Sequence, residues 1–83
     1  MADSSGDMRI LIEQIAQGLV DHPDQVTVNQ VEDEHGILLE LKVMPDDVGK
    51  VIGRQGRTVR ALRHLLSAAS LRSAKRFELE ILE

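Results

Sequence analysis

The sequence predicts a small α+β domain whose elements follow the order α-β-β-α-α-β, and three observations support this. Apolar residues recur at spacings of three and four over residues 8–20 and 59–69, which is the period of helices that cover a core. Apolar and polar residues alternate over residues 37–43 and 77–81, which is the period of half-buried strands. Short segments that contain proline, glycine or aspartate separate these runs, as expected of turns.

The first helix is expected over residues 8–20, with Ser5 or Asp7 as its N-cap. Its apolar stripe consists of Met8, Leu11, Ile12, Ile15 and Leu19. Pro23 follows in the segment Asp21-His22-Pro23-Asp24, and proline disfavours helical geometry in the residue before it. The chain is therefore expected to turn after the first helix.

Two strands are expected next, as an antiparallel hairpin. Val26-Thr27-Val28 opens the first strand, and the second is the alternating run of Ile37, Leu39, Leu41 and Val43. Between them, Asp33-Glu34-His35-Gly36 has the polar, glycine-containing composition of a hairpin turn. A third strand is expected at the end of the chain, where Glu78 and Glu80 alternate with Phe77, Leu79 and Ile81.

Two helices are expected between the second and third strands. The short one is opened by Pro45-Asp46-Asp47, and its aspartates are expected to cap it rather than form a catalytic pair, because adjacent helical residues point in different directions. The apolar stripe of the longer helix consists of Val59, Leu62, Leu65, Leu66 and Ala69. A separate face of the same helix carries Arg57, Arg60, His64 and Ser67.

The length and composition limit what the chain can do. With 83 residues it is expected to be one thin-cored domain over residues 8–83, preceded by a flexible segment over residues 1–7. So small a domain has little room for an enclosed substrate pocket, and we therefore expect no enzyme. The absence of cysteine excludes disulfides and thiolate nucleophiles. Three histidines without the i, i+4 spacing predict no metal site, and no cofactor is expected.

The start of the chain and its hydropathy favour a cytoplasmic location. Residues 1–7 are acidic and polar, whereas a secretory signal needs a basic start followed by an apolar stretch. The longest aliphatic run, Ile37-Leu38-Leu39, is far short of the roughly 20 apolar residues that span a bilayer. We therefore expect neither export nor membrane insertion.

The net charge of −4 hides a strong separation of charge along the chain. Residues 1–47 carry eleven acids and two bases, and residues 77–83 carry three acids and no base. Residues 48–76 carry eight bases and no acid. A concentrated basic stretch is typical of phosphate binding, and an acidic remainder limits indiscriminate contact with polyanions. Charge alone does not separate this interpretation from a solvated basic helix face.

The most informative segment is the loop that Gly53 and Gly56 bracket between the two helices. Glycine permits a tight turn and lets a ligand approach the backbone without a Cβ in the way. The loop leads directly into a helix N-terminus, where free amide groups and the helix dipole favour an anion. A phosphodiester there would have Arg54, Arg57 and Lys50 around it.

Two other glycine motifs do not fit this segment. A Walker A loop that ends at Gly56 needs a glycine at position 51 and a lysine at position 57, but the chain has Val51 and Arg57. The dinucleotide fingerprint also needs a glycine in place of Val51, and it must follow a strand directly. Nucleotide hydrolysis and dinucleotide binding are therefore not expected.

The segment Ile52-Gly53-Arg54-Gln55-Gly56 resembles the signature of the KH (K-homology) family, an Ile-Gly-x-x-Gly sequence that joins two helices. The order of elements is similar to that of type II KH domains. This resemblance implies a three-stranded sheet packed on one side by three helices, and a loop that clamps the backbone of single-stranded RNA. The expected RNA-binding residues are Gly53, Arg54, Gln55, Gly56, Lys50, Arg57 and Arg60. For the adjacent base-binding groove, the sequence offers the aliphatic residues Val48, Val51, Leu41 and Val43.

The resemblance also implies a cellular role. It suggests a cytoplasmic bacterial RNA chaperone or post-transcriptional regulator, in a family linked to cell shape and cell-wall biogenesis. Such a protein is expected to form a homodimer, or a heterodimer with a second, larger KH protein. Because Phe77 is the only aromatic residue, base stacking should contribute little and RNA affinity should be modest.

Two alternatives remain open at this point. A helix, a glycine-containing turn and an arginine-rich second helix also describe a helix-turn-helix DNA-binding motif, although the flanking strands disfavour it. The basic helix face could instead dock an acidic protein partner, in which case polynucleotides would not compete with that partner.

Overall fold

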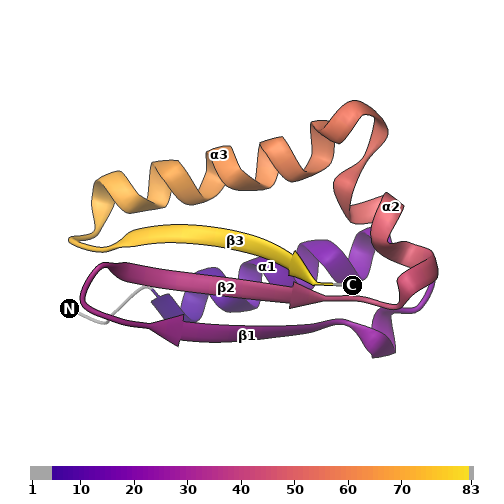
Figure 1. Cartoon of the computed structure of the whole chain (residues 1–83), viewed down its shortest axis with the longest axis horizontal. Coiled ribbons are helices and arrows are strands. Elements are labelled where there is room, and N and C mark those ends of the chain that lie inside the picture. Colours follow the sequence, from indigo (N-terminus) through magenta and orange to yellow (C-terminus); the bar gives the residue numbers. More distant parts are fainter. Residues whose placement is uncertain (1–4, 83) are drawn as a thin grey trace.

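The computed structural model describes residues 5–82 and has the predicted order of elements (Figure 1). The helices and strands are α1 (Ser5–Leu19), β1 (Thr27–Glu32), β2 (Gly36–Lys42), α2 (Val48–Ile52), α3 (Arg57–Arg72) and β3 (Arg76–Leu82). Three short 3-10 turns lie between them, at Pro23–Gln25, Pro45–Asp47 and Arg54–Gly56. No helix within residues 5–82 is both long and apolar enough to cross a membrane.

The three strands form one mixed sheet in the order β1-β2-β3. β1 and β2 pair antiparallel, as the hairpin composition predicted, and the turn is fixed by Asp33. Its carboxylate Oδ1 accepts hydrogen bonds from the backbone amides of His35 (2.8 Å) and Gly36 (3.0 Å). β2 and β3 pair in parallel, which requires a long crossover connection, and α2 and α3 form that crossover.

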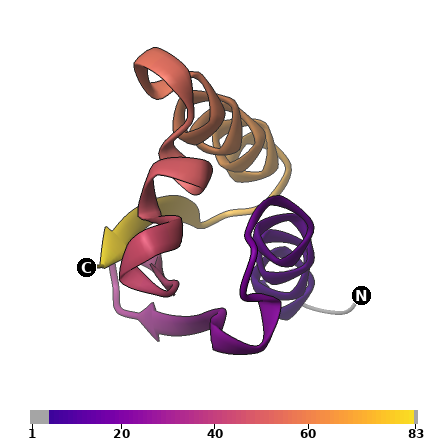
Figure 2. The ribbon, with the colours of Figure 1, turned by 90° about the vertical axis from the view of Figure 1, so that its right-hand side faces the viewer.

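One face of the sheet is buried beneath the helices, and the opposite face is more exposed (Figure 2). The buried strand residues are Val28, Ile37, Leu39, Leu41, Phe77 and Leu79. The helical residues that complete this core are Ile12 and Ala16 of α1, Val51 of α2, and Val59, Leu62 and Leu66 of α3. The predicted α+β class, with helices on one side of a three-stranded sheet, is confirmed.

α1 begins earlier than the sequence predicted. It starts at Ser5 rather than near Met8, so residues 5–7 of the expected flexible segment are helical, and residues 1–4 lie outside the described residues. Asp7 lies in the first turn instead of at the N-cap, where its carboxylate is favourable near the positive end of the helix dipole. No proline interrupts residues 5–8, so the helix can extend toward the N-terminus.

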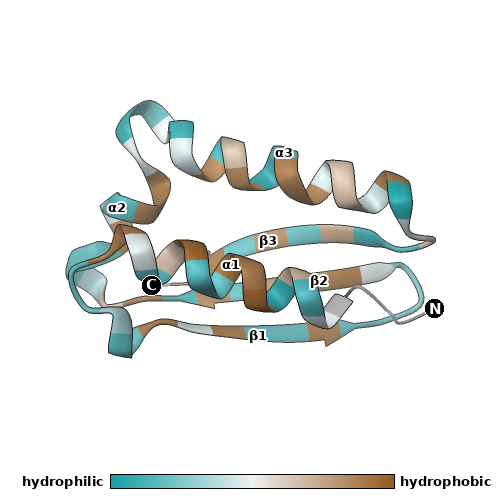
Figure 3. Cartoon of the chain, turned by 180° about the vertical axis from the view of Figure 1, so that it is seen from behind, coloured by the Kyte–Doolittle hydropathy of each residue, from teal (hydrophilic) through white to brown (hydrophobic). Residues whose placement is uncertain are grey.

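The predicted apolar stripes were too wide. Leu11 and Leu19 of α1 are 37% and 39% exposed, and Leu65 of α3 is 38% exposed. Each helix packs on the sheet along a narrow line, so leucines at the flanks of the stripe remain in contact with solvent. Figure 3 shows hydrophobic and hydrophilic positions interspersed along α1 and α3.

Candidate nucleic-acid interface

The connection between α2 and α3 has an unusual backbone. Gly53 has φ 78° and ψ 168°, and Gln55 (φ 58°) and Gly56 (φ 74°) both adopt left-handed conformations. The amide of Gly53 closes α2 on the carbonyl of Gly49 (2.9 Å), and the amide of Gly56 donates to the carbonyl of Gly53 (3.0 Å). The loop is therefore a compact turn, and the side chains of Arg54 and Gln55 are exposed at its tip.

The two glycines are required for different reasons. A Cβ at Gly53 would overlap the hydroxyl of Thr58 and lie 2.9 Å from the Thr58 amide nitrogen, so no larger side chain fits. Around Gly56 the nearest atoms would be 3.9 Å away, so only the positive φ disfavours a side chain there. Gly53 thus lets the loop pack directly on the first turn of α3.

Arg60 stabilises the loop from within. Its guanidinium Nη2 donates a hydrogen bond to the backbone carbonyl of Gln55 (2.5 Å). A left-handed conformation costs free energy in any residue with a Cβ, and this contact offsets part of that cost at Gln55. Arg60 was predicted as an RNA contact, and the structure adds a role within the protein.

The N-terminus of α3 is open to an anion. No side chain caps it, and the positive end of the dipole of this 16-residue helix lies there, although the amide of Arg57 itself donates to the carbonyl of Arg54. Arg57 begins the helix and is exposed, and Arg54 precedes it by one turn. Within residues 5–82, no ion pair with a carboxylate involves Arg54, Arg57, Arg60, Arg63 or Arg72.

The other three bases of the basic stretch are paired with acids. Lys50 lies with its Nζ 3.0 Å from Asp21, whose carboxylate raises the pKa of the Lys50 ammonium. Lys75 pairs with Glu32, and Arg76 lies 3.4 Å from Glu78. The start of α3 therefore brings together the loop glycines, Arg54, Arg57 and Arg60. Lys50 instead pairs with Asp21 in the connection between α1 and β1.

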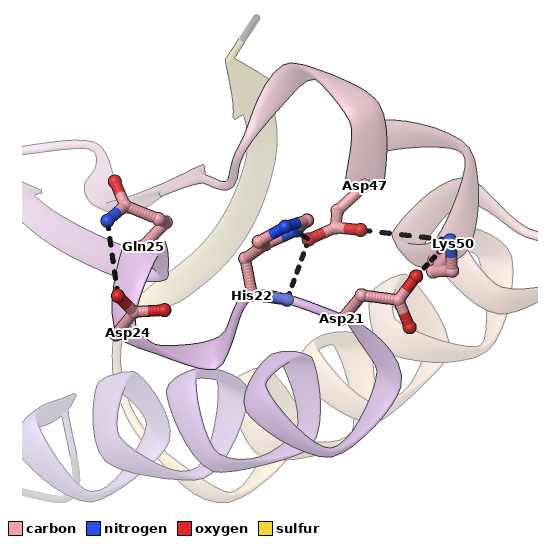
Figure 4. A network of polar contacts seen from close by, with 6 residues as sticks. All are labelled: Asp21, His22, Asp24, Gln25, Asp47 and Lys50. Carbon is pink, nitrogen blue, oxygen red and sulfur yellow. Dashed lines mark hydrogen bonds and ion pairs between the residues drawn. The ribbon is translucent and has the colours of Figure 1, made fainter.

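Asp47 is not the helix cap that the sequence predicted. It occupies the N-cap position of α2, but its side chain makes no capping hydrogen bond and is only 1% exposed. Its Oδ2 accepts a hydrogen bond from the backbone amide of His22 (3.0 Å) and lies 2.9 Å from the ring Nδ1 of His22 (Figure 4). A contact between residues 25 positions apart leaves no local sequence pattern, so only the fold reveals it.

The contact shifts the pKa values of both partners. Burial disfavours the charged form of Asp47, but the hydrogen bonds from His22 and from the Asp21 backbone, together with the charge of His22, outweigh this and lower the pKa of the carboxyl below its ordinary value. The hydrogen bond to Asp47 raises the pKa of His22, despite a smaller opposing effect of burial. The pair is therefore best satisfied with Asp47 ionised and His22 protonated.

A groove of about 510 Å³ lies between α3 and β3. α3 contributes Arg63, Ser67 and Ser70 to its walls, and β3 contributes Glu78 and Leu79 among others. The aliphatic residues that the sequence offered for a base-binding groove lie elsewhere, since Leu41, Val43 and Val51 are buried in the core and Val48 packs against it. Arg63 and Ser67 line this groove, but they lie beside the apolar stripe of α3. Their spacing in the sequence therefore did not distinguish groove residues from residues that simply face solvent.

Comparisons with known proteins agree on one family. Residues 9–81 match the family described as KhpA/KhpB, KH domain. The RNA-binding protein KhpA of Halalkalibacterium halodurans is 50% identical over 92% of this chain and all of the relative. The protein of the same name from Clostridium acetobutylicum is 51% identical over 90% of this chain and all of the relative, and that of Aquifex aeolicus is 46% identical over 92% and 96%.

The loop geometry predicts that Gly53→Ala destabilises the domain more than Gly56→Ala. A side chain at position 56 adds only the cost of a left-handed backbone, about 1–2 kcal/mol. At position 53 the overlap with Thr58 comes in addition, and overpacking typically costs about 1–3 kcal/mol more. Urea unfolding followed by circular dichroism measures both variants, and equal free energies of unfolding would contradict the packing role of Gly53.

Proposed function

Because the chain belongs to the KhpA/KhpB family of KH domains, we propose that it binds single-stranded RNA by clamping the phosphodiester backbone at the loop Gly53–Gly56. The observation that carries this proposal is the left-handed loop directly before the uncapped N-terminus of α3. The relatives are named RNA-binding proteins, which supports RNA as the ligand. The same names favour RNA binding over the alternative of a helix-turn-helix protein that binds DNA.

Two kinds of donor would hold a phosphate at this loop. Beyond Arg57, whose amide donates to the carbonyl of Arg54, the amides of the first turn of α3 have no side-chain cap, so they can donate to the phosphate oxygens. Arg54 and Arg57 have no carboxylate partner within residues 5–82, so RNA does not have to displace an ion pair to reach them. Arg60 would contribute by its charge and by holding Gln55 in place.

The groove between α3 and β3 is the surface on which we expect the bases to lie. Arg60 bonds to the loop and Arg63, one helical turn further on, lines the groove, so the two surfaces adjoin along α3. Ser67 and Glu78 offer a hydroxyl and a carboxylate to base edges, whereas the hydroxyl of Ser70 already donates to the carbonyl of Leu66 and accepts from the amide of Phe77. None of the groove-lining residues except Phe77 is aromatic, and Phe77 is buried, so affinity should depend mainly on phosphate contacts.

The cellular part of the proposal rests on the family. We expect a non-enzymatic protein of the cytoplasm that acts as an RNA chaperone or post-transcriptional regulator and affects cell shape and cell-wall biogenesis. Docking of an acidic protein on the basic face of α3 is the alternative to RNA binding. Under this alternative, polynucleotides would not compete with the acidic partner.

The domain is also proposed to pair with a second copy or with a larger KH protein. The helices leave Leu11, Leu19 and Leu65 partly exposed. Thin-cored domains commonly gain stability by burying such side chains against a partner. Covering these leucines would protect apolar area while leaving the loop Gly53–Gly56 free.

The RNA site is tested by replacing Arg54 and Gln55 together with aspartate. Aspartate tolerates the left-handed backbone of position 55, and both side chains are exposed, so stability should change by only about 0.5 kcal/mol each. Two carboxylates would repel the approaching phosphate, and affinity should fall about 100-fold or more. Fluorescence anisotropy with a labelled oligoribonucleotide and circular dichroism melts on the same samples measure both quantities.

The matched control replaces Leu71 and Arg72 with aspartate at the opposite end of α3. This pair is exposed and changes the net charge by the same amount, so it tests whether charge alone accounts for the loss. We expect the control to reduce affinity far less. The loop would be rejected as the site if the variant of Arg54 and Gln55 melted normally and still bound RNA like the parent.

Self-association is tested by sedimentation equilibrium of the parent and of Leu65→Glu. The parent should form a dimer at high protein concentration, and Leu65→Glu should shift the equilibrium toward monomer because a charge would be buried in the interface. Leu71→Glu, at a more exposed position on the same helix, is the control. A parent that stays monomeric throughout the concentration range would contradict self-association.

A further inference from the structure

We infer that Asp47 is a positioning residue for RNA binding: its buried carboxylate fastens the connection between α1 and β1 to the start of α2, and so fixes where the loop Gly53–Gly56 stands. This inference rests on the proposed function of the loop. Asp47 does not contact RNA in this account, because its side chain is enclosed by the protein.

The contacts of Asp47 join segments that are distant in sequence. Oδ2 receives the backbone amide of His22 at 3.0 Å and faces the imidazole Nδ1 of the same residue at 2.9 Å (Figure 4). One carboxylate oxygen thus holds both the main chain and the side chain of His22, which lies three residues after the end of α1. Because both donors belong to His22, the contact restricts the orientation of that residue relative to Asp47.

α2 transmits this constraint to the loop because it is so short. It has five residues, Val48–Ile52, and a helix of that length is unstable unless tertiary contacts hold it. Asp47 anchors its first turn and the fully buried Val51 anchors its middle. Gly53 ends it with a hydrogen bond to Gly49, so any tilt at the start of α2 displaces the loop.

Lys50 belongs to the same network. The second oxygen of Asp47, Oδ1, is buried and accepts no hydrogen bond within the described residues. The ammonium of Lys50 lies 3.7 Å from Oδ1, and Asp21 holds this ammonium from the other side at 3.0 Å. A buried carboxylate without nearby positive charge is strongly destabilising, so Lys50 compensates Asp47 instead of serving primarily as a phosphate ligand.

The direction in which RNA affinity changes when the charge of Asp47 is removed separates positioning from electrostatics. If Asp47 acted on RNA through its negative field, its removal would strengthen binding of the polyanion. If Asp47 positions the loop, its removal lowers the population of the binding-competent loop and weakens the apparent affinity in proportion. The two roles predict opposite changes.

The experiment compares Asp47→Asn with Asp46→Asn by anisotropy with a labelled oligoribonucleotide. Asp46 is the exposed neighbour in the same 3-10 turn, so its substitution removes the same charge without touching His22. Asp47→Asn should weaken RNA binding about tenfold, within the usual range for coupling between two positions, and Asp46→Asn should leave it unchanged or slightly tighter. Circular dichroism melts set a working temperature at which every variant is folded.

The pH dependence of binding is a readout that a general loss of stability would not reproduce. The groups that face His22 are Asp47 from the start of α2, and Asp21 and Asp24 from its own connection, and Lys50 lies 3.7 Å from the other oxygen of Asp47. Protonation of His22 strengthens the contact, so RNA affinity of the parent should rise as pH falls through the raised pKa of His22. The midpoint should shift to lower pH in Asp47→Asn, and this contribution should vanish in His22→Ala, which still contains His35 and His64.

The outcomes distinguish a failure of the positioning role of Asp47 from a failure of RNA binding at the loop. Asp47→Asn that binds RNA as tightly as the parent, while aspartates at positions 54 and 55 abolish binding, would overturn the positioning role and leave the loop as the site. Normal binding by the variant of Arg54 and Gln55 would overturn the proposed function itself. If Asp47→Asn does not fold, His22→Ala is the deciding variant, because it keeps the hydrogen bond from the backbone amide of residue 22 to Asp47. RNA affinity and a pH profile that both match the parent in His22→Ala would reject the inference.

Discussion

The parallel pairing of β2 with β3 is the constraint on which the rest of the structure depends. Strands that run in the same direction need a connection that returns the chain to the opposite end of the sheet, and α2 and α3 supply it. The chain must reverse where α2 gives way to α3, and the glycine loop forms that reversal. The loop therefore projects from the crossover, with the N-terminus of α3 directly behind it.

Alternating and helical periods were enough to predict the fold, because burial on one face of a sheet imposes them directly. Ile37, Leu39 and Leu41 are buried as their alternation indicated, and the glycines of the loop adopt the positive φ for which glycine is needed. The flanks of the helices were not predictable in this way. Leu65 and Leu66 are adjacent and equally apolar, and only the angle at which α3 meets the sheet decides that Leu66 is buried.

The polar contacts around the loop were beyond sequence reasoning for a different reason. Asp47 follows a proline at a helix start, which is the usual setting of a cap, yet the fold brings His22 against it and buries it. Lys50 and Arg60 both belong to the basic stretch, but one pairs with Asp21 and the other with a loop carbonyl. The charge pattern along the chain indicated the candidate site, whereas tertiary contacts decide which of its bases pair with acids and which bond to the loop.

The salt dependence of RNA binding tests the central claim, that phosphate contacts at the loop dominate recognition, most directly. Affinity for a single-stranded oligoribonucleotide and for duplex DNA would be measured over a series of salt concentrations. With about three phosphates neutralised, the slope of log affinity against log salt should be near roughly −2, with tighter binding to the single-stranded RNA throughout. A slope near zero, or a preference for the DNA duplex, would contradict the account.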